Sequence, residues 1–198
     1  MKKYEFYPVN TFIKKEENIV GEILQVIKDK KIEKFDEPTF AKIENEPFHN
    51  GIIEVKVLSK IMVDAPDFAR GFLGVSFRIN QDNRKFETIY IRPANSRSRD
   101  QLRRNHTTQY FSYPDFKFDR LRKESSGVYE SYVDIGIEEW IDIKIIVKGI
   151  VAELYINNSK NPALIVNDLK HGDSVGAIGL WVEVGTEGYF KDLVITHK

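Results

Sequence analysis

The chain has 198 residues, 41% of them hydrophobic and 30% charged, and its 30 basic side chains balance its 30 acidic ones. This is the composition of a folded globular domain, and a formal net charge of zero gives the whole chain no general attraction to nucleic acid or to a membrane. The lack of cysteine excludes disulfides and thiolate metal sites. No apolar stretch is long enough to span a bilayer. The start shows no signal peptide, but a trimmed secreted chain would look the same, so a cytoplasmic and a secreted location both stay open.

The first 34 residues give no single pattern. Residues 1–17 lack a clean period and are expected to form an entry segment. Two interpretations of residues 18–34 stay open, because Ile19, Ile23 and Ile27 fit the stripe of a helix, while EILQVIKD and KIEKF fit two short strands. A glycine at position 21 would weaken a helix by about 1 kcal/mol relative to alanine, which does not decide between them.

Strand patterns dominate beyond Pro38. The segment TFAKIE leads through an Asn50-Gly51 turn into IIEVKVLSKIMV, in which alternate apolar residues share one face. The DAPDFA segment that follows is expected to be a loop because of its proline and aspartates.

Residues 71–93 predict a β-hairpin at the centre of the chain. Alternate residues of GVSFRI and FETIYI are apolar, and the joining residues 80–83 are turn formers. Alternation leaves one face of this hairpin open, and that face carries Arg78, Tyr90 and Arg92.

The longest stretch without alternation is 94–127, which we expect to be a long basic and aromatic loop. Between Arg97 and Lys123 it holds eight arginines or lysines against three aspartates, with five aromatic residues interleaved. Loops of this length inside a compact domain are usually functional or mobile.

The C-terminal third again predicts strands. YESYVDIG fits a strand or an extended arm, WIDIKIIVK and VAELYIN form a hairpin about Gly149, and PALIVNDL, GAIGLWVEVG and YFKDLVITHK follow. Short strands at regular spacing, separated by Gly, Pro, Asn and Asp, predict an all-β sandwich. Since no linker or repeat is visible, we expect one domain over residues 1–198.

The order of these segments resembles the C-terminal half of concanavalin A-like jelly rolls. A tryptophan-led strand, a turn glycine, a strand ending in Asn, a Gly-x-Ile-Gly-Leu strand and a Phe-x-x-Leu-x-Ile strand follow one another here. Upstream, PFHNGIIEVKV, GVSFRI and FETIYIRP resemble the matching strands of laminin G-like and 3-keto-disaccharide hydrolase (DUF1080-like) domains. The resemblance covers roughly 40–196, implies a two-sheet antiparallel jelly-roll β-sandwich and favours a strand within 18–34. This superfold hosts lectins, glycosidases and adhesion modules, so no single activity follows.

The sequence departs from the glucanases of this fold, which resemble one another in a Glu-x-Asp-x-Glu strand. The nearest stretch here, Glu139 to Asp142, has a different spacing and places its two carboxylates on opposite faces of a strand. Glycoside cleavage generally needs two carboxylates about 5 to 10 Å apart. Ordinary glucanase activity is therefore not expected.

The resemblance implies a ligand site on the concave sheet. By strand parity, the outward residues of that sheet are Arg78, Tyr90, Arg92, Trp181 and Glu183. A saccharide would stack on Trp181 and Tyr90. Arg92 and Gln109 would donate hydrogen bonds to it, and Glu183 would accept hydrogen bonds from it. Further residues that would close the site are Asn105, His106 and Tyr110.

Two alternatives to this site stay open. In the structural one, Glu183 pairs with Arg78 or Arg92, Trp181 lies under a loop, and the aromatic residues of RRNHTTQYFSYP fill the domain. In the catalytic one, Glu183 or His106 transfers a proton. Glu87, which parity places inward, is a lesser candidate for the same role.

Other charged groups are weaker candidates. Arg120, Arg122 and Lys123 would meet an anionic ligand or, more simply, pair with nearby acids. A calcium site, common in this superfold, would take oxygen ligands from residues 167–173 and Asp192, although their spacing is not diagnostic. Three isolated histidines are expected to be surface residues: His49, His171 and His197.

The favoured hypothesis is a carbohydrate-binding domain that recognises a saccharide on its concave sheet. The alternatives are a hydrolase or lyase acting on a modified sugar in the same cleft, and a laminin G-like module that binds a protein partner. Arginines between aromatic residues also fit single-stranded nucleic acid, but the neutral chain argues against it. No cofactor is expected apart from calcium, and no membrane partner is expected.

Overall fold

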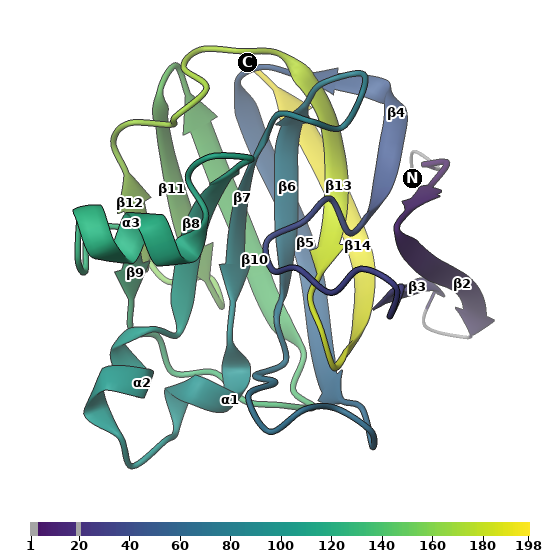
Figure 1. Cartoon of the computed structure of the whole chain (residues 1–198). Helices are drawn as coiled ribbons and strands as arrows, with labels where there is room; N and C mark the ends of the chain where they lie inside the picture. Colours follow the sequence, from purple (N-terminus) through teal and green to yellow (C-terminus); the bar gives the residue numbers. More distant parts are fainter. Residues whose placement is uncertain (1–3, 19–20) are drawn as a thin grey trace.

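The computed structural model describes residues 4–18 and 21–198, whose strands form two antiparallel sheets packed face to face (Figure 1). The front sheet contains, in spatial order, β1 (Tyr7–Val9), β4 (Phe40–Phe48), β13 (Gly176–Val182), β6 (Leu73–Ile79), β7 (Phe86–Ile91), β8 (Thr108–Tyr113) and β9 (Glu130–Ser131). The back sheet contains β12 (Leu164–Val166), β11 (Val151–Ile156), β10 (Ile141–Lys148), β5 (Gly51–Ile61), β14 (Thr186–His197), β3 (Gly21–Lys28) and β2 (Thr11–Asn18). The predicted all-β, two-sheet antiparallel sandwich is confirmed.

The core between the sheets follows from alternation in the back sheet. In β10, Ile141, Ile143, Ile145 and Val147 are buried, whereas the residues between them are partly exposed. Ile143 lies beside Val55 of β5, which is also buried. Branched side chains suit a pleated surface with one buried face, so the back sheet packs this apolar face against the front sheet.

The centre of the front sheet is buried on both faces. Every residue of β6 and β7 is buried, because a further layer of chain covers the face that points away from the core. One part of this layer is the connection 29–39 between β3 and β4, which crosses in front of the sheet in dark blue in Figure 1. Another is α3 (Phe118–Glu124), whose first N–H donates to Asp36 of that connection at 2.7 Å. The open concave face expected from strand parity is therefore largely covered by the chain itself.

Two segments expected to lack regular structure contain it. Residues 1–17 include β1 and most of β2. The expected loop at 94–127 contains β8, α3, most of α1 (Pro93–Ser96) and all of α2 (Gln101–Asn105). Because β8 is buried on both faces over most of its length, its sequence TQYFSY shows no alternation and the pattern concealed it.

Within the ambiguous segment 18–34, residues 21–28 form a strand rather than a helix. β3 confirms the strand interpretation of EILQVIKD. The second expected strand, KIEKF, is wrong, because these residues belong to the connection 29–39 and form no strand. Ile19 lies outside the described residues.

Strand register brings one end of the front sheet together with several connections. Leu73 pairs with both Ile91 and Val182, so β6, β7 and β13 reach this end at the same level. The connection 62–72 enters β6 here, and α1 and α2 follow β7. At this end of the front sheet, the connection 62–72 and the helices α1 and α2 therefore lie next to the ends of β6, β7 and β13.

Among the described helices, none has the length and apolar character required to cross a membrane.

Candidate functional site

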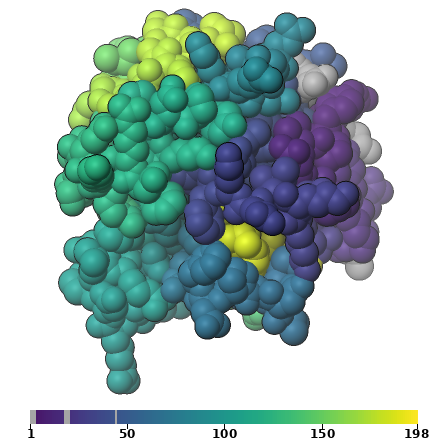
Figure 2. Space-filling view, viewed as in Figure 1, coloured from purple at the N-terminus to yellow at the C-terminus, as the bar shows by residue number. Residues whose placement is uncertain are grey.

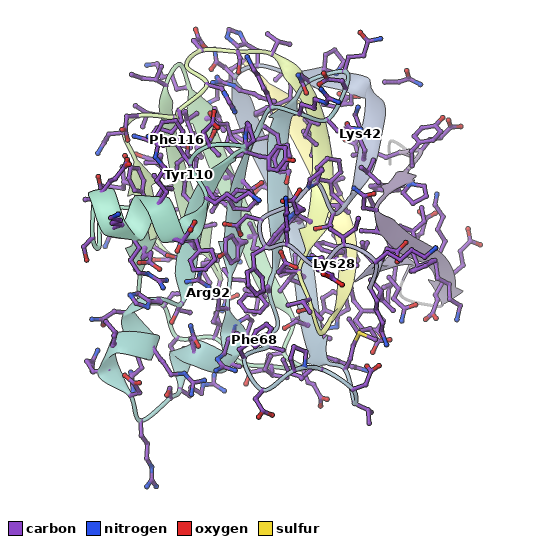
Figure 3. The ribbon with its side chains drawn as sticks, in the orientation of Figure 1. Lys28, Lys42, Phe68, Arg92, Tyr110 and Phe116 are labelled. Atoms are coloured by element: carbon purple, nitrogen blue, oxygen red, sulfur yellow. The ribbon has the colours of Figure 1, made fainter. Side chains whose placement is uncertain are left out.

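A cavity of about 510 Å³ opens at the end of the front sheet where these connections meet. Dark blue, blue and teal segments surround this place in Figure 2, and Figure 3 labels Phe68 and Arg92 there. Such a volume is within the range of small-ligand sites. The residues that line it are Phe35, Asp36, Phe68, Arg70, Phe72, Tyr90, Arg92, Asn95, Arg103, His106, Phe118, Arg122 and Glu183.

Aromatic rings form one wall of the cavity. Phe35 and Phe68 meet edge to face with ring centroids 5.5 Å apart, and Phe118 lies 6.3 Å from Phe35. Phe35 is 41% exposed and Phe68 is 48% exposed, which is high for such large apolar side chains. Solvated ring surfaces at the edge of a cavity favour a ligand with an apolar face.

Arg92 forms the floor together with Tyr90, directly after the end of β7. Its guanidinium donates to the Tyr90 hydroxyl at 2.5 Å and to Gln109 Oε1 at 3.1 Å, and it also contacts Glu130 Oε1 at 3.2 Å. Burial raises the pKa of Tyr90 well above its usual value, so this hydroxyl stays protonated. Several partners therefore fix Arg92 in one orientation.

Glu130 is shared between two arginines behind this floor. Besides Arg92, it accepts from Arg122 Nε at 3.0 Å, and His106 Nε2 lies 3.4 Å from its second oxygen. Burial opposes the ionisation of Glu130, but the hydrogen bond from Arg122 and the charge of Arg92 hold its pKa below the usual value. Burial lowers the pKa of His106 despite the nearby Glu130 carboxylate, which favours a neutral imidazole.

Two carboxyl groups from distant parts of the chain also line the cavity. Glu183, just after β13, accepts from the Asp36 N–H at 2.9 Å and from Lys28 Nζ of β3. Asp36 is 1% exposed and has a φ of 52°, a left-handed conformation that aspartate tolerates. Burial raises the pKa of Asp36 to about 7, and the negative charge of Glu183 contributes in the same direction. Asp36 is thus a carboxyl group that can gain or lose a proton near neutral pH.

Four of the residues predicted from the sequence meet in this cavity: Tyr90, Arg92, His106 and Glu183. The expectation of an exposed Trp181 is wrong. Its side chain is fully buried, its Nε1 donates to the Glu37 carbonyl at 3.0 Å, and its ring lies 4.9 Å from that of Tyr90. Trp181 therefore supports the cavity floor from below.

Arg78 lies at the opposite end of the front sheet and does not line the cavity. A register shift in β13 and a φ of 54° at Arg78 place its guanidinium among the carbonyls of His49, Gly149 and Gly172. The structural alternative is wrong in pairing Glu183 with Arg78 or Arg92, because Lys28 is the cation that Glu183 contacts. It is confirmed in placing Trp181 under a loop, the connection 29–39.

The three other residues predicted to close the site, Gln109, Tyr110 and Asn105, lie in three different places. Gln109 is fully buried and both ends of its amide are engaged, so it orients Arg92 from behind instead of meeting a ligand. Tyr110 points to the other face of the sheet, where its hydroxyl donates to Glu87 at 2.7 Å; the inward position predicted for Glu87 is confirmed. Asn105 is exposed on α2 and accepts from the Gln101 side chain.

Most of the remaining charged candidates have protein partners. Arg120 pairs with Glu124 and Arg122 with Glu130, as the simpler interpretation expected, whereas Lys123 forms no ion pair among the described residues. The three histidines are not isolated, since His49 contacts Asp173, His197 contacts Glu46 and His171 contacts the Tyr113 carbonyl. Within the described part of the chain, no three His, Cys, Asp or Glu side chains cluster in a way that would hold a metal ion. Asp168, Asp173 and Asp192, proposed for calcium, each have a cationic neighbour.

Sequence reasoning missed most of the cavity wall, including Phe35, Asp36, Phe68, Arg70 and Arg103. These residues lie on connections without periodicity, so strand parity could not place them. One usable signal was present in the DAPDFA loop (64–69) and in the FDEP stretch (35–38), each of which has a phenylalanine among turn residues. An apolar ring in an otherwise polar loop is a candidate for a contact surface.

Comparisons with known proteins identify the fold. No family model matches the sequence, and neither does any curated protein. The solved structure of the carbohydrate-binding module CBM66 from Bacillus subtilis matches over 94% of each chain with 11% identity and a TM-score of 0.56. The chain has a concanavalin A-like β-sandwich fold. A provisionally named glycosyl hydrolase from Parabacteroides distasonis matches over 98% of this chain and 100% of its own, with 11% identity and a TM-score of 0.54.

A third match is a Bacillus subtilis protein of unknown function with a galectin-like fold. It covers 96% of this chain and 97% of its own, with 11% identity and a TM-score of 0.51. Identities of this size establish a common architecture and leave the ligand to be argued from the cavity.

Proposed function

We propose that this β-sandwich binds a saccharide in the cavity at the end of its front sheet. The observation that carries the proposal is the pairing of exposed Phe35 and Phe68 with the fixed polar groups of Arg92 across one cavity. Sugar rings present an apolar face of C–H groups and an edge of hydroxyls, so they need both kinds of surface at once. The similarity of fold to a carbohydrate-binding module supports the same proposal.

The roles of the residues differ from those expected on the concave face. Phe68 and Phe35 take the stacking role first given to Trp181, while Tyr90 and Arg92 present polar groups from the floor. His106 and Asp36 come from two segments far apart in the sequence, and both line the cavity with further hydrogen-bonding groups. Because the floor stands on strands and is braced by Trp181, it is organised before a ligand arrives.

The test is a screen of neutral and acidic oligosaccharides, followed by calorimetric titration of each ligand found. We expect Phe68→Ala to weaken binding at least about tenfold, since an aromatic contact surface is removed. Phe12→Ala is the matched control, because Phe12 is 62% exposed on the edge strand β2 and lies outside the cavity lining. Equal affinities for the two variants, or a blank screen, would overturn the proposal and favour a protein partner.

A second candidate function is a hydrolase or lyase acting on a modified sugar in the same cavity. The observation that favours it is Asp36, a buried cavity carboxyl whose pKa is raised to about 7. A group with this pKa can donate a proton in one step and accept one in another at neutral pH. Asp36 suits this role better than Glu183, whose carboxylate is committed to Lys28 and to two backbone N–H groups.

Product analysis separates the two functions. Each bound saccharide is incubated with the protein and the products are examined by mass spectrometry. An enzyme would give products that Asp36→Asn reduces by about a hundredfold or more while binding persists. Unchanged saccharides after long incubation would leave binding as the function.

A further inference from the structure

Two arginines of the cavity wall stand without an acidic partner. Arg92 and Arg122 share Glu130, but within residues 4–18 and 21–198 no carboxylate lies within 4 Å of Arg70 or Arg103. Both arginines line the same cavity, and burial together with the charge of Arg103 lowers the pKa of Arg70 against the opposing effect of the Asp67 carboxylate. Like charges placed together at a cavity are a feature of anion sites.

Local contacts position the side chain of Arg70 and the backbone of Arg103. Arg70 Nη1 donates to the carbonyls of Asp67 and Ala69, at 2.6 and 2.7 Å. Arg103 follows the N-cap of α2, where the Asp100 side chain accepts from the Leu102 and Arg103 N–H groups. The Nε atom of Arg103 is buried, and in the described structure it has no hydrogen-bond partner.

An orphaned acceptor lies in the same wall. Asn95 is 5% exposed, and its Nδ2 donates to the His106 carbonyl at 3.0 Å. Its Oδ1 is buried and, among the described residues, has no donor. A buried donor and a buried acceptor left unpaired in one wall each carry a desolvation cost that a ligand with complementary groups would remove.

We infer that the cavity selects a saccharide with an anionic group, which Arg70 and Arg103 bind while Asn95 Oδ1 accepts from a neighbouring hydroxyl. This inference rests on the proposed saccharide function and names its ligand class. A uronate carboxylate is the form we favour, because a planar guanidinium matches its two oxygens. Arg103 also borders a neighbouring hollow, but the other arginine there, Arg97, is paired with Asp134 and Glu139.

The experiment compares charged and neutral forms of one sugar. Oligosaccharides ending in glucuronate or galacturonate are titrated calorimetrically, each beside its methyl ester, at about 50 and 500 mM salt. We expect the acid to bind at least about tenfold more tightly than the ester at low salt, with a smaller difference at high salt. A galactose 6-sulfate ligand that matches the uronates would assign the site to any anionic group, and a weaker one would assign it to carboxylates.

Variants assign the preference to the two arginines. Arg103→Gln and Arg70→Gln should each bring the affinity of the acid close to that of the ester, without weakening the ester. Arg99→Gln removes the same charge from an exposed position of the same segment outside the cavity and should leave the preference intact. Thermal unfolding of each variant checks that it is folded.

The outcomes that would overturn the acidic preference differ from those that would overturn saccharide binding. Equal binding of acid and ester by the unaltered protein, or binding of neutral glycans alone, would overturn the acidic preference and leave the saccharide proposal standing. Failure of every saccharide would overturn both.

Discussion

Lys28 and Glu183 form an ion pair in the interior beside the cavity, with only 4% and 3% of their side chains exposed. The partners come from the last residue of β3 and the residue after β13, which lie in different sheets. Lys28 also donates to the Lys34 carbonyl at 2.8 Å, and Glu183 accepts from the N–H of Asp36. The pair therefore fastens the connection 29–39, and with it one cavity wall, to the sandwich.

Removal of one partner should leave a buried charge without compensation. Lys28→Met is expected to lower the free energy of unfolding by about 3 to 5 kcal/mol, measured by urea denaturation. Lys30→Met, which breaks the exposed pair with Asp64, should cost less than about 1 kcal/mol. The double change Lys28→Met with Glu183→Leu should recover most of the loss; a double variant as unstable as Lys28→Met would contradict this account.

Trp181 is expected to contribute to stability rather than to stack on a ligand. Trp181→Ala removes a fully buried ring that packs against Tyr90 and Phe111, and should cost about 3 to 5 kcal/mol in denaturant unfolding. Trp140→Ala is the matched control, since that ring is 37% exposed, and should cost about 1 kcal/mol or less. Similar losses for the two variants would argue against the buried role of Trp181.

Asp36 should make stability depend on pH in an unusual direction. From its ordinary pKa of 3.8 up to about 7, the folded protein keeps a proton that the unfolded chain has released. Its stabilising contribution is thus complete below about 3.8 and is lost as pH rises through about 7.

The change in free energy from this group is on the order of 4 kcal/mol. Asp36→Asn should remove this part of the slope, which urea midpoints at about pH 4.5, 6 and 7.5 would measure as a difference from the unaltered protein. Parallel curves for the two proteins would contradict the raised pKa.

Arg78 should matter for stability and not for binding. Its guanidinium joins the carbonyls of three loops at the end opposite the cavity, so Arg78→Met leaves several part-buried acceptors unpaired. We expect a loss of about 2 to 4 kcal/mol in unfolding free energy. Saccharide affinity of the folded variant, measured by calorimetry, should stay within about twofold; a larger drop would restore Arg78 to the ligand site.

The fold could be predicted because most strands of the back sheet expose one face. Alternation along the sequence predicted that Ile53 and Ile145 face the core, and the turn residues between β6 and β7 predicted their hairpin. The position of β8 could not be predicted, since both faces of this strand are buried and its polar residues Thr108, Gln109 and Ser112 lie among the aromatic ones without alternation.

The site was predictable only where it lies on or directly beside strands. Tyr90, Arg92 and Glu183 were found from strand parity, and His106 from its unusual sequence context. Parity failed for Trp181 because it states which face a side chain occupies and does not state whether another segment covers that face. Phe35, Phe68 and Arg70 are brought to the cavity by tertiary contacts of loops, such as the hydrogen bond from the Asp36 N–H to Glu183.

The placement of Trp181 under Tyr90 has an optical consequence. The chain has two tryptophans, and they lie in opposite environments: Trp181 is enclosed beneath the cavity, whereas Trp140 is partly solvated on the other sheet beside Lys191. Acrylamide should therefore quench the emission of Trp140 and spare the bluer emission of Trp181. A molecule that enters the cavity would disturb the spared signal through Tyr90, so the folded chain carries its own reporter of occupancy and an internal reference beside it.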